Sequence, residues 1–156
     1  MVSKQNLTPQ QAFQKIKQYC AYQERCHSEV KEKLYGYGLS KNDTEDIVSK
    51  LISENYLNEE RFASLFAGGK FRTKGWGKTK IRFELKKKQI SDYCIKKALG
   101  QIDYDDYLKT LENLFEKKLA TLKSEKKIYI KKRKLQDYML QKGFESDLIR
   151  DHLKTI

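Results

Sequence analysis

Apolar residues recur every three to four positions along most of this chain, a period that predicts amphipathic α-helices. Near the N-terminus they run at this spacing over residues 12–20. The preceding residues 8–11 (TPQQ) combine a capping box with proline at the first helical position, so a helix should begin there. A second helix is expected over residues 28–36, and Asn42 or Asp43 is expected to cap a third.

One spacing of apolar residues returns three times. The steps are 4, 5, 5 and 4 residues in the second and third occurrences and 4, 5, 8 and 4 in the first, which we interpret as a three-residue loop insertion near Lys41. The positions are Val30, Leu34, Leu39, Ile47 and Leu51, then Ile81, Leu85, Ile90, Ile95 and Leu99, then Leu135, Met139, Phe144, Ile149 and Leu153. Helices this short are not stable alone and must pack on one another. We therefore predict an all-α fold of three tandem three-helix units, at residues 1–56, 57–102 and 103–156, in an elongated, curved array.

Residues 56–90 carry the clearest local signals. Asn58 followed by two glutamates marks a helix start, because it offers a capping side chain and then acids near the positive end of the helix dipole. Gly75 and Gly77 stand on either side of Trp76, and glycine weakens a helix interior but suits its end. We expect a helix, a tight basic turn and a second helix.

Positive charge is concentrated in two parts of the chain. The formal net charge is +12, and 18 of the 33 Lys and Arg residues lie at 70–88 and 117–134, each of which contains a single glutamate. This distribution is typical of proteins that bind an anionic partner, either nucleic acid or an acidic protein surface. The alternative is a lysine-rich helix face that only keeps the protein in solution.

Composition narrows the class of protein. One proline, eight glycines and 35% charged residues favour an α-rich soluble protein. No apolar run approaches the roughly 18 residues that a membrane span needs, and the N-terminus does not resemble a signal peptide. The three cysteines are odd in number and follow no pattern, which fits a reducing compartment. We expect a cytoplasmic protein with buried thiols and no membrane association.

The motifs do not predict catalysis. Residues 77–79 resemble the end of a phosphate-binding P-loop, but Arg72 stands where that motif requires glycine. Cys26 and His27 are adjacent and have no partners at metal-ligand spacing. We therefore predict no catalytic residue, no metal site and no cofactor, and a protein that is not an enzyme.

A family resemblance covers nearly the whole chain. Residues 56–63 (YLNEERFA) followed by residues 70–77 (KFRTKGWG) resemble the central signature of the bacterial RecX family. Residues 25–34 resemble its first-unit pattern, and residues 142–149 resemble its closing helix pair. Two departures are Asn58, where the family more usually has aspartate, and the long lysine-rich segment of the third unit.

The resemblance implies a non-catalytic regulator of the RecA recombinase. Proteins of this family lie in the groove of the RecA–DNA filament and limit filament growth, strand exchange, ATP hydrolysis and co-protease activity. They thereby modulate DNA repair by homologous recombination and the SOS response. The implied partners are the RecA filament and single- or double-stranded DNA, and we expect the protein to be a monomer.

We predict two contact surfaces. The surface for the filament consists of Lys70, Arg72, Lys74, Trp76 and Lys78, with Arg61 as a weaker candidate. Cations interleaved with an aromatic residue favour a binding role, since arginine and tryptophan are enriched at binding hot spots. A core position is the alternative for Trp76, and an ion pair with Glu59 at the helix start is the alternative for Arg61.

The surface for nucleic acid lies in the third unit. It consists of Lys126, Lys127, Lys131, Lys132, Arg133 and Lys134, with Tyr129 among them. A tyrosine among cations can stack on a base while the cations contact phosphates. A solvated helix face is the alternative.

Two other classes of function remain open. One is a regulator that binds duplex DNA through helix-turn-helix-like units, with one helix per unit in the major groove. The other is a helical scaffold that binds an acidic protein.

Overall fold

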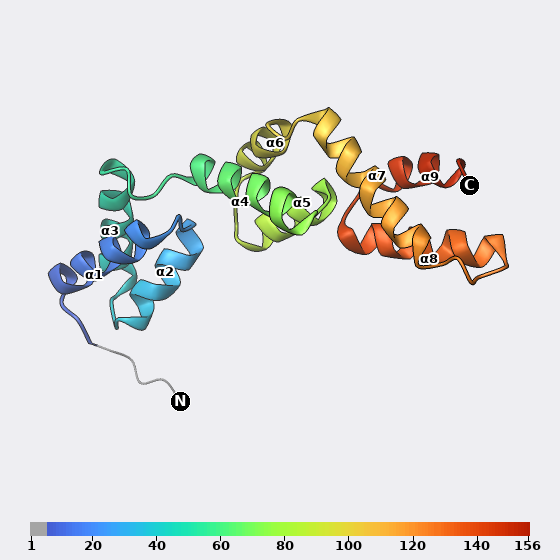
Figure 1. The fold of residues 1–156 in the computed structure, drawn as a ribbon. Helices are drawn as coiled ribbons and strands as arrows, with labels where there is room; N and C mark the ends of the chain where they lie inside the picture. The colour runs from blue at the N-terminus through green and yellow to red at the C-terminus, as the bar shows by residue number, and fades with distance from the viewer. Residues whose placement is uncertain (1–5) are drawn as a thin grey trace.

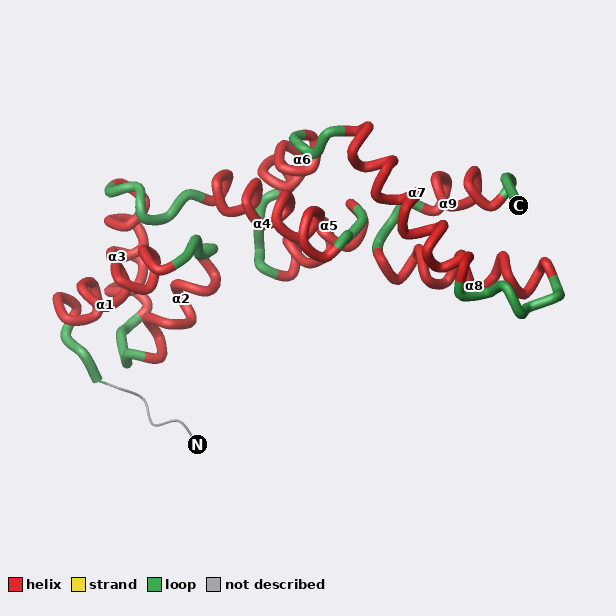
Figure 2. Tube along the Cα trace, in the orientation of Figure 1, coloured by secondary structure: helices red, strands yellow, loops and turns green. Residues whose placement is uncertain are grey.

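The computed structural model describes residues 6–156, and every regular element in this range is an α-helix. The helices are α1 (Pro9–Tyr22), α2 (His27–Gly36), α3 (Lys41–Ser53), α4 (Glu59–Lys74), α5 (Lys78–Lys87), α6 (Asp92–Gly100), α7 (Tyr104–Ala120), α8 (Ile128–Lys142) and α9 (Ser146–Leu153). Successive groups of three helices follow one another along an elongated arc (Figure 1), and short connections join them (Figure 2). The prediction of an all-α, curved array of three-helix units is confirmed.

The predicted caps of α1 and α4 are present. The Thr8 hydroxyl accepts the backbone N–H of Gln11 at 3.2 Å, and the Gln11 side chain accepts the N–H of Thr8 at 3.0 Å. Asn58 caps α4, and Gly75 ends it in the left-handed conformation with φ 66°. These starts and ends follow from local sequence, because each cap satisfies backbone groups that the helix itself leaves unpaired.

Helix α3 begins earlier than predicted. Its N-cap is Ser40, not Asn42 or Asp43, and the Ser40 hydroxyl accepts the N–H of Asp43 at 3.1 Å. Asn42 and Asp43 therefore lie inside the first turn of the helix.

The early start of α3 restores the spacing of the repeat. In each unit the fourth residue after the N-cap of the third helix is buried; these residues are Thr44, Ile95 and Ile149. With Thr44 and Val48 as its last two positions, the first repeat also has steps of 4, 5, 5 and 4. The predicted insertion near Lys41 is therefore wrong. The first repeat looked interrupted only because its fourth position is a threonine, whereas the other two repeats have an apolar residue there.

Replacing Thr44 by valine should stabilise the protein. Thr44 is fully buried, and its hydroxyl oxygen has no hydrogen-bond partner among the described residues. Valine has nearly the same shape and removes the unpaired hydroxyl, so we expect the free energy of unfolding in urea to rise by about 1 kcal/mol. Thr44→Ser keeps the hydroxyl and removes a methyl group, and it should lower that free energy by about 1 kcal/mol. A valine variant no more stable than the parent would contradict this account.

The buried side chains form two clusters. One belongs to α1, α2 and α3, and the other runs continuously through α4–α9. Aromatic rings connect the second and third units within the larger cluster: the ring centroids of Phe71 and Tyr107 are 5.7 Å apart, and those of Tyr107 and Phe144 are 5.3 Å apart. The second and third units therefore share one core, which Cys26 of the first unit also joins.

The turn between α4 and α5 is docked on the turn between α8 and α9. The N–H of Gly77 donates to the carbonyl of Lys142 at 2.8 Å, and the N–H of Thr79 donates to the carbonyl of Gly143 at 2.9 Å. A β-carbon on Gly77 would overlap the backbone of Gly143 and Phe144. The two backbones can approach this closely only because neither glycine carries a side chain.

Tyr107 reinforces the same junction. Its hydroxyl accepts the backbone N–H of Lys78 at 2.9 Å and donates to the Glu145 carboxylate. Burial, and then the hydrogen bond to Glu145, raises the pKa of Tyr107 far above its ordinary value. The phenol therefore stays protonated and keeps its bond to Glu145 across the neutral and moderately alkaline range.

Polar contacts join the first unit to the second. Arg61 pairs with Glu24, with 2.6 Å between Nε and Oε1, and its guanidinium also donates to the side chain and carbonyl of Asn55. The ion pair expected between Arg61 and Glu59 is wrong, because Glu59 instead accepts the backbone N–H of Ser91 at 2.5 Å. Arg61 thus holds the linker between two units.

The cysteines take the positions expected of structural thiols. Cys20, Cys26 and Cys94 are buried and free, and burial raises the pKa of Cys20 to about 11.

Within residues 6–156, no group of His, Cys, Asp and Glu is placed to hold a metal ion. No helix in this range has the length and apolar character to cross a bilayer.

Candidate partner-binding surface

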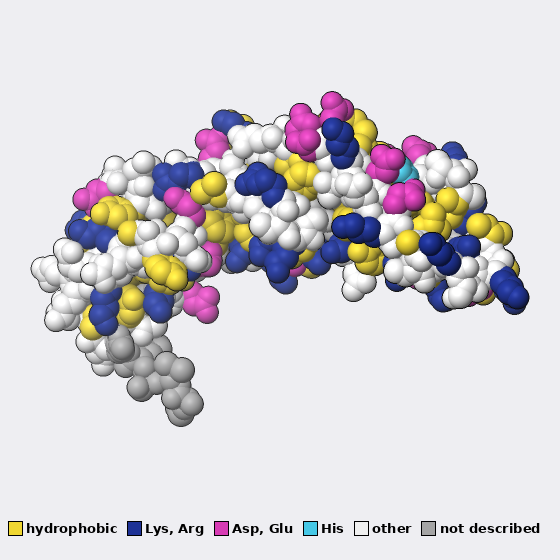
Figure 3. Space-filling view, in the orientation of Figure 1, with side chains coloured by type: hydrophobic (Ala, Val, Ile, Leu, Met, Phe, Trp, Pro, Cys, Tyr) yellow, Lys and Arg dark blue, Asp and Glu magenta, His cyan; other side chains and the backbone are white. Residues whose placement is uncertain are grey.

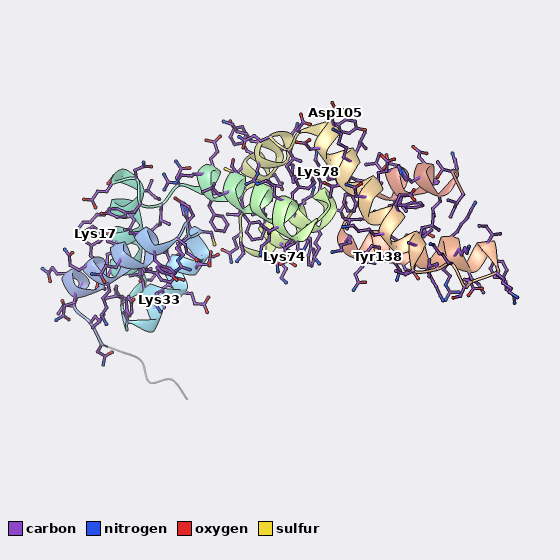
Figure 4. The ribbon with its side chains drawn as sticks, in the orientation of Figure 1. Lys17, Lys33, Lys74, Lys78, Asp105 and Tyr138 are labelled. Atoms are coloured by element: carbon purple, nitrogen blue, oxygen red, sulfur yellow. The ribbon has the colours of Figure 1, made fainter. Side chains whose placement is uncertain are left out.

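Charge is distributed unevenly around the arc. Lys and Arg side chains gather along the lower edge of the middle unit, whereas Asp and Glu side chains gather along the upper edge near the start of α7 (Figure 3). Lys74 lies on the lower edge and Asp105 on the upper edge (Figure 4). An anionic partner would therefore meet attraction on one side of the arc and repulsion on the other.

Trp76 has the side chains of two lysines within cation–π distance of its ring. Its ring is half-buried and meets Phe66 edge-on, with 6.3 Å between the ring centroids. The Nζ atoms of Lys70 and Lys80 stand 5.1 Å and 4.6 Å from the Trp76 ring centre. Cation–π attraction orders these lysines while one side of the indole packs on the core. Trp76 thus combines the two alternatives, a core contact and a place on the surface.

The third unit contributes to the same surface. The turns that contain Gly77 and Gly143 are docked on each other, and we call this contact the glycine junction. Across it, the Lys142 ammonium donates to the carbonyl of Lys74 at 3.3 Å. Lys74 lies four residues after Lys70 and therefore on the same side of α4, about 40° around the helix. We call Lys70, Lys74, Trp76, Lys80 and Lys142 the basic–aromatic patch.

Three of the predicted residues, Arg72, Lys78 and Arg61, lie elsewhere. Arg72 is two residues from Lys70, about 200° around the helix, so it faces away from the patch. It lines a separate hollow with Asp103 and Asp106. The Nζ atom of Lys78 stands 4.9 Å from the ring centre of Tyr107. Arg61 is outside the patch as well, in its contacts with Glu24 and Asn55.

Sequence reasoning missed Lys80 and Lys142. Lys80 belongs to the basic run at 70–88, and its i+4 relation to Trp76 across the turn could have suggested the contact. Nothing local marks Lys142, because it reaches the patch through tertiary packing between the second and third units.

The six cations predicted to bind nucleic acid belong to the loop before α8 and to α8 itself, at the far end of the arc (Figure 1). Their side chains are divided between faces. Tyr129 and Arg133 are four residues apart and share an exposed side of α8, with Lys132 beside them. Lys131 lies instead with Ile128 against the end of α7.

The other three cations lie near Glu125. Lys134 pairs with the Glu125 carboxylate at 3.9 Å, and the backbone N–H of Lys127 donates to that carboxylate at 3.1 Å. Lys126 is exposed in the loop between α7 and α8. Lys126, Lys132 and Arg133 are therefore the members that neither contact the Glu125 carboxylate nor lie with Ile128 against α7.

Comparison with known proteins identifies the units. Residues 58–99 match the model of the second three-helix domain of RecX, and residues 105–153 match that of the third. The chain is similar to the crystal structure of RecX from Lactobacillus salivarius, with a TM-score of 0.83 and 26% identity over 95% of this chain and 97% of that one. A second crystal structure, of a regulatory protein RecX, has a TM-score of 0.84 at 22% identity, which supports the fold.

Sequence relatives agree with this match. The regulatory protein RecX of Prosthecochloris aestuarii is 30% identical over 138 residues, covering 88% of each chain. That of Thermotoga maritima is 28% identical over 98% of this chain and 89% of its own. The chain spans about half of the longer Bacillus licheniformis protein, at 30% identity over 52% of that length. Together with the domain matches, these similarities show that the chain belongs to the RecX family.

Proposed function

We propose that this protein binds the RecA–DNA filament and restrains it by occupancy, without chemistry of its own. Filament growth, strand exchange, ATP hydrolysis and co-protease activity would then fall together, because all depend on the same assembled filament. The protein would act in the cytoplasm as a monomer, in DNA repair and the SOS response.

The observation that carries this proposal is the basic–aromatic patch, which two units build across a junction with a shared core. A patch held in this way is preorganised, so little conformational entropy is lost on binding. An extended arc also suits a repetitive partner, since several weak contacts to adjacent subunits act at high effective concentration.

The direct test is ATP hydrolysis by RecA filaments assembled on single-stranded DNA. We expect the hydrolysis rate to fall as the protein is added, with inhibition weakening as salt is raised because the surface is cationic. If hydrolysis stays unchanged while the protein binds naked duplex DNA with sequence preference, the helix-turn-helix alternative would replace this proposal.

A separate binding experiment tests whether the third unit contacts DNA. The triple variant Lys126→Ala, Lys132→Ala and Arg133→Ala removes the three cations that neither contact the Glu125 carboxylate nor lie with Ile128 against α7. If each contacts a phosphate, the salt-dependence slope of binding to single-stranded DNA should fall in magnitude by about 2. An unchanged slope would exclude these residues from DNA contact and leave the filament proposal standing.

A further inference from the structure

A pocket of about 360 Å³ opens at the far end of the arc, between the end of α7 and the start of α8. Its apolar lining is Leu119, Ala120, Ile128 and Ile156. Ile128 remains 51% exposed although it is a large aliphatic side chain at the first position of a helix. An exposed aliphatic hollow on a strongly charged surface is typical of a binding site for an apolar side chain.

The rim of this pocket is cationic. Lys123 and Lys131 line it together with one acid, Glu116. The surrounding residues 117–134 contain nine Lys and Arg and a single glutamate, Glu125, which already pairs with Lys134 at 3.9 Å. Among the side chains that line the pocket, two lysines outnumber one glutamate, so the rim carries a net positive charge.

We propose that this pocket binds an acidic peptide segment through a bulky apolar side chain, which inserts between α7 and α8 while neighbouring carboxylates meet Lys123 and Lys131. The charge selects an acidic partner, and the aliphatic floor selects an anchor of leucine size. Apolar anchors set among complementary charges are a recurring mode of peptide recognition.

The lining disfavours two other occupants. A nucleic acid strand has no aliphatic side chain to bury, and the pocket contains no aromatic ring on which a base could stack. The exposed ring of Tyr129 lies on a different side of α8. A second copy of this chain, docked through the same end, would bring two cationic surfaces together, and like charges oppose association.

The test uses a fluorescein-labelled dodecapeptide in which glutamates surround two central leucines, and a matched peptide with both leucines replaced by serine. By fluorescence anisotropy we expect the leucine peptide to bind at least tenfold more tightly than the serine peptide. Ile128→Ser should weaken the leucine peptide about tenfold and leave the serine peptide unchanged. Ile128 is half exposed, so this variant should keep the circular dichroism of the parent.

A matched pair of charge variants separates the rim from the rest of α8. Lys131→Gln should weaken the leucine peptide three- to tenfold, whereas Lys132→Gln, with the same loss of charge on a similarly half-buried lysine, should change binding less than twofold. Equal binding of the two peptides, or equal effects of the two glutamine variants, would overturn the proposal. The proposal would also be overturned if sedimentation showed a dimer that Ile128→Ser dissociates. The same holds if the protein bound a duplex DNA 20-mer and Ile128→Ser abolished that binding.

Discussion

Replacing Gly77 by alanine is expected to destabilise the protein by about 3 kcal/mol, the largest effect we expect from a single added methyl group. The new β-carbon would overlap the carbonyl group of Gly143 and the backbone N of Phe144. Backbone atoms cannot rotate aside as a side chain can, so the two turns must separate. Separation breaks the hydrogen bonds from Gly77 to Lys142 and from Thr79 to Gly143, of 2.8 Å and 2.9 Å.

The control is Gly69→Ala. Gly69 lies inside α4, and a β-carbon there would meet nothing within 4 Å. Alanine is favoured over glycine in a helix interior, so this variant should stabilise the protein by about 0.5–1 kcal/mol. Urea unfolding followed by circular dichroism measures both variants. A Gly77→Ala protein within 0.5 kcal/mol of the parent, a threshold of about the error of such a fit, would show that the glycine junction does not hold the two units.

Reversing three charges of the basic–aromatic patch should abolish inhibition of the RecA filament. The variant Lys70→Glu, Lys74→Glu and Lys80→Glu changes the patch charge by six units, and it places carboxylates beside the Trp76 ring, where the ammonium groups of Lys70 and Lys80 now stand at 5.1 Å and 4.6 Å. Like-charge contact with an anionic assembly costs several kcal/mol, so we expect binding to weaken by about 100-fold or more at low salt. Titration of filament ATP hydrolysis and direct filament binding are the measurements.

Charge reversal elsewhere tests whether position or total charge matters. Lys96, Lys109 and Lys154 are exposed on or beside other helices, and reversing all three changes the net charge by the same amount. This control should retain inhibition within about threefold, since well-separated exposed charges are screened over about 10 Å. If both triple variants lose inhibition equally, binding depends on net charge and the patch is not the contact surface.

The helices and most of their ends were predictable because they depend on near neighbours in the chain. The capping box at Thr8 and the left-handed Gly75 are local solutions to unpaired backbone groups. The apolar spacing predicted which side of each helix is buried. It failed at Thr44, where a polar residue occupies a core position and made an unbroken repeat look like one with an insertion.

The candidate surface was predictable only in part. The basic run and Trp76 indicated the correct turn, but sequence adjacency could not tell that Arg72 faces Asp103 and Asp106 while Lys70 and Lys80 flank the indole. Helical geometry separates neighbours in the chain by about 100° each, so a run of cations is never a single surface. Arg61 illustrates the same point, since its partner Glu24 lies in another unit.

The amino-acid sequence by itself determined the all-α class, the three-unit repeat and the concentration of positive charge, because periodicity, capping and charge are properties of contiguous residues. Only the tertiary structure decided which cations share a surface and why Gly77 is required. The φ of Gly77 is −76°, a conformation open to any residue. What demands glycine there is the backbone of residues 142–144, more than sixty positions away, and no local pattern records such an approach.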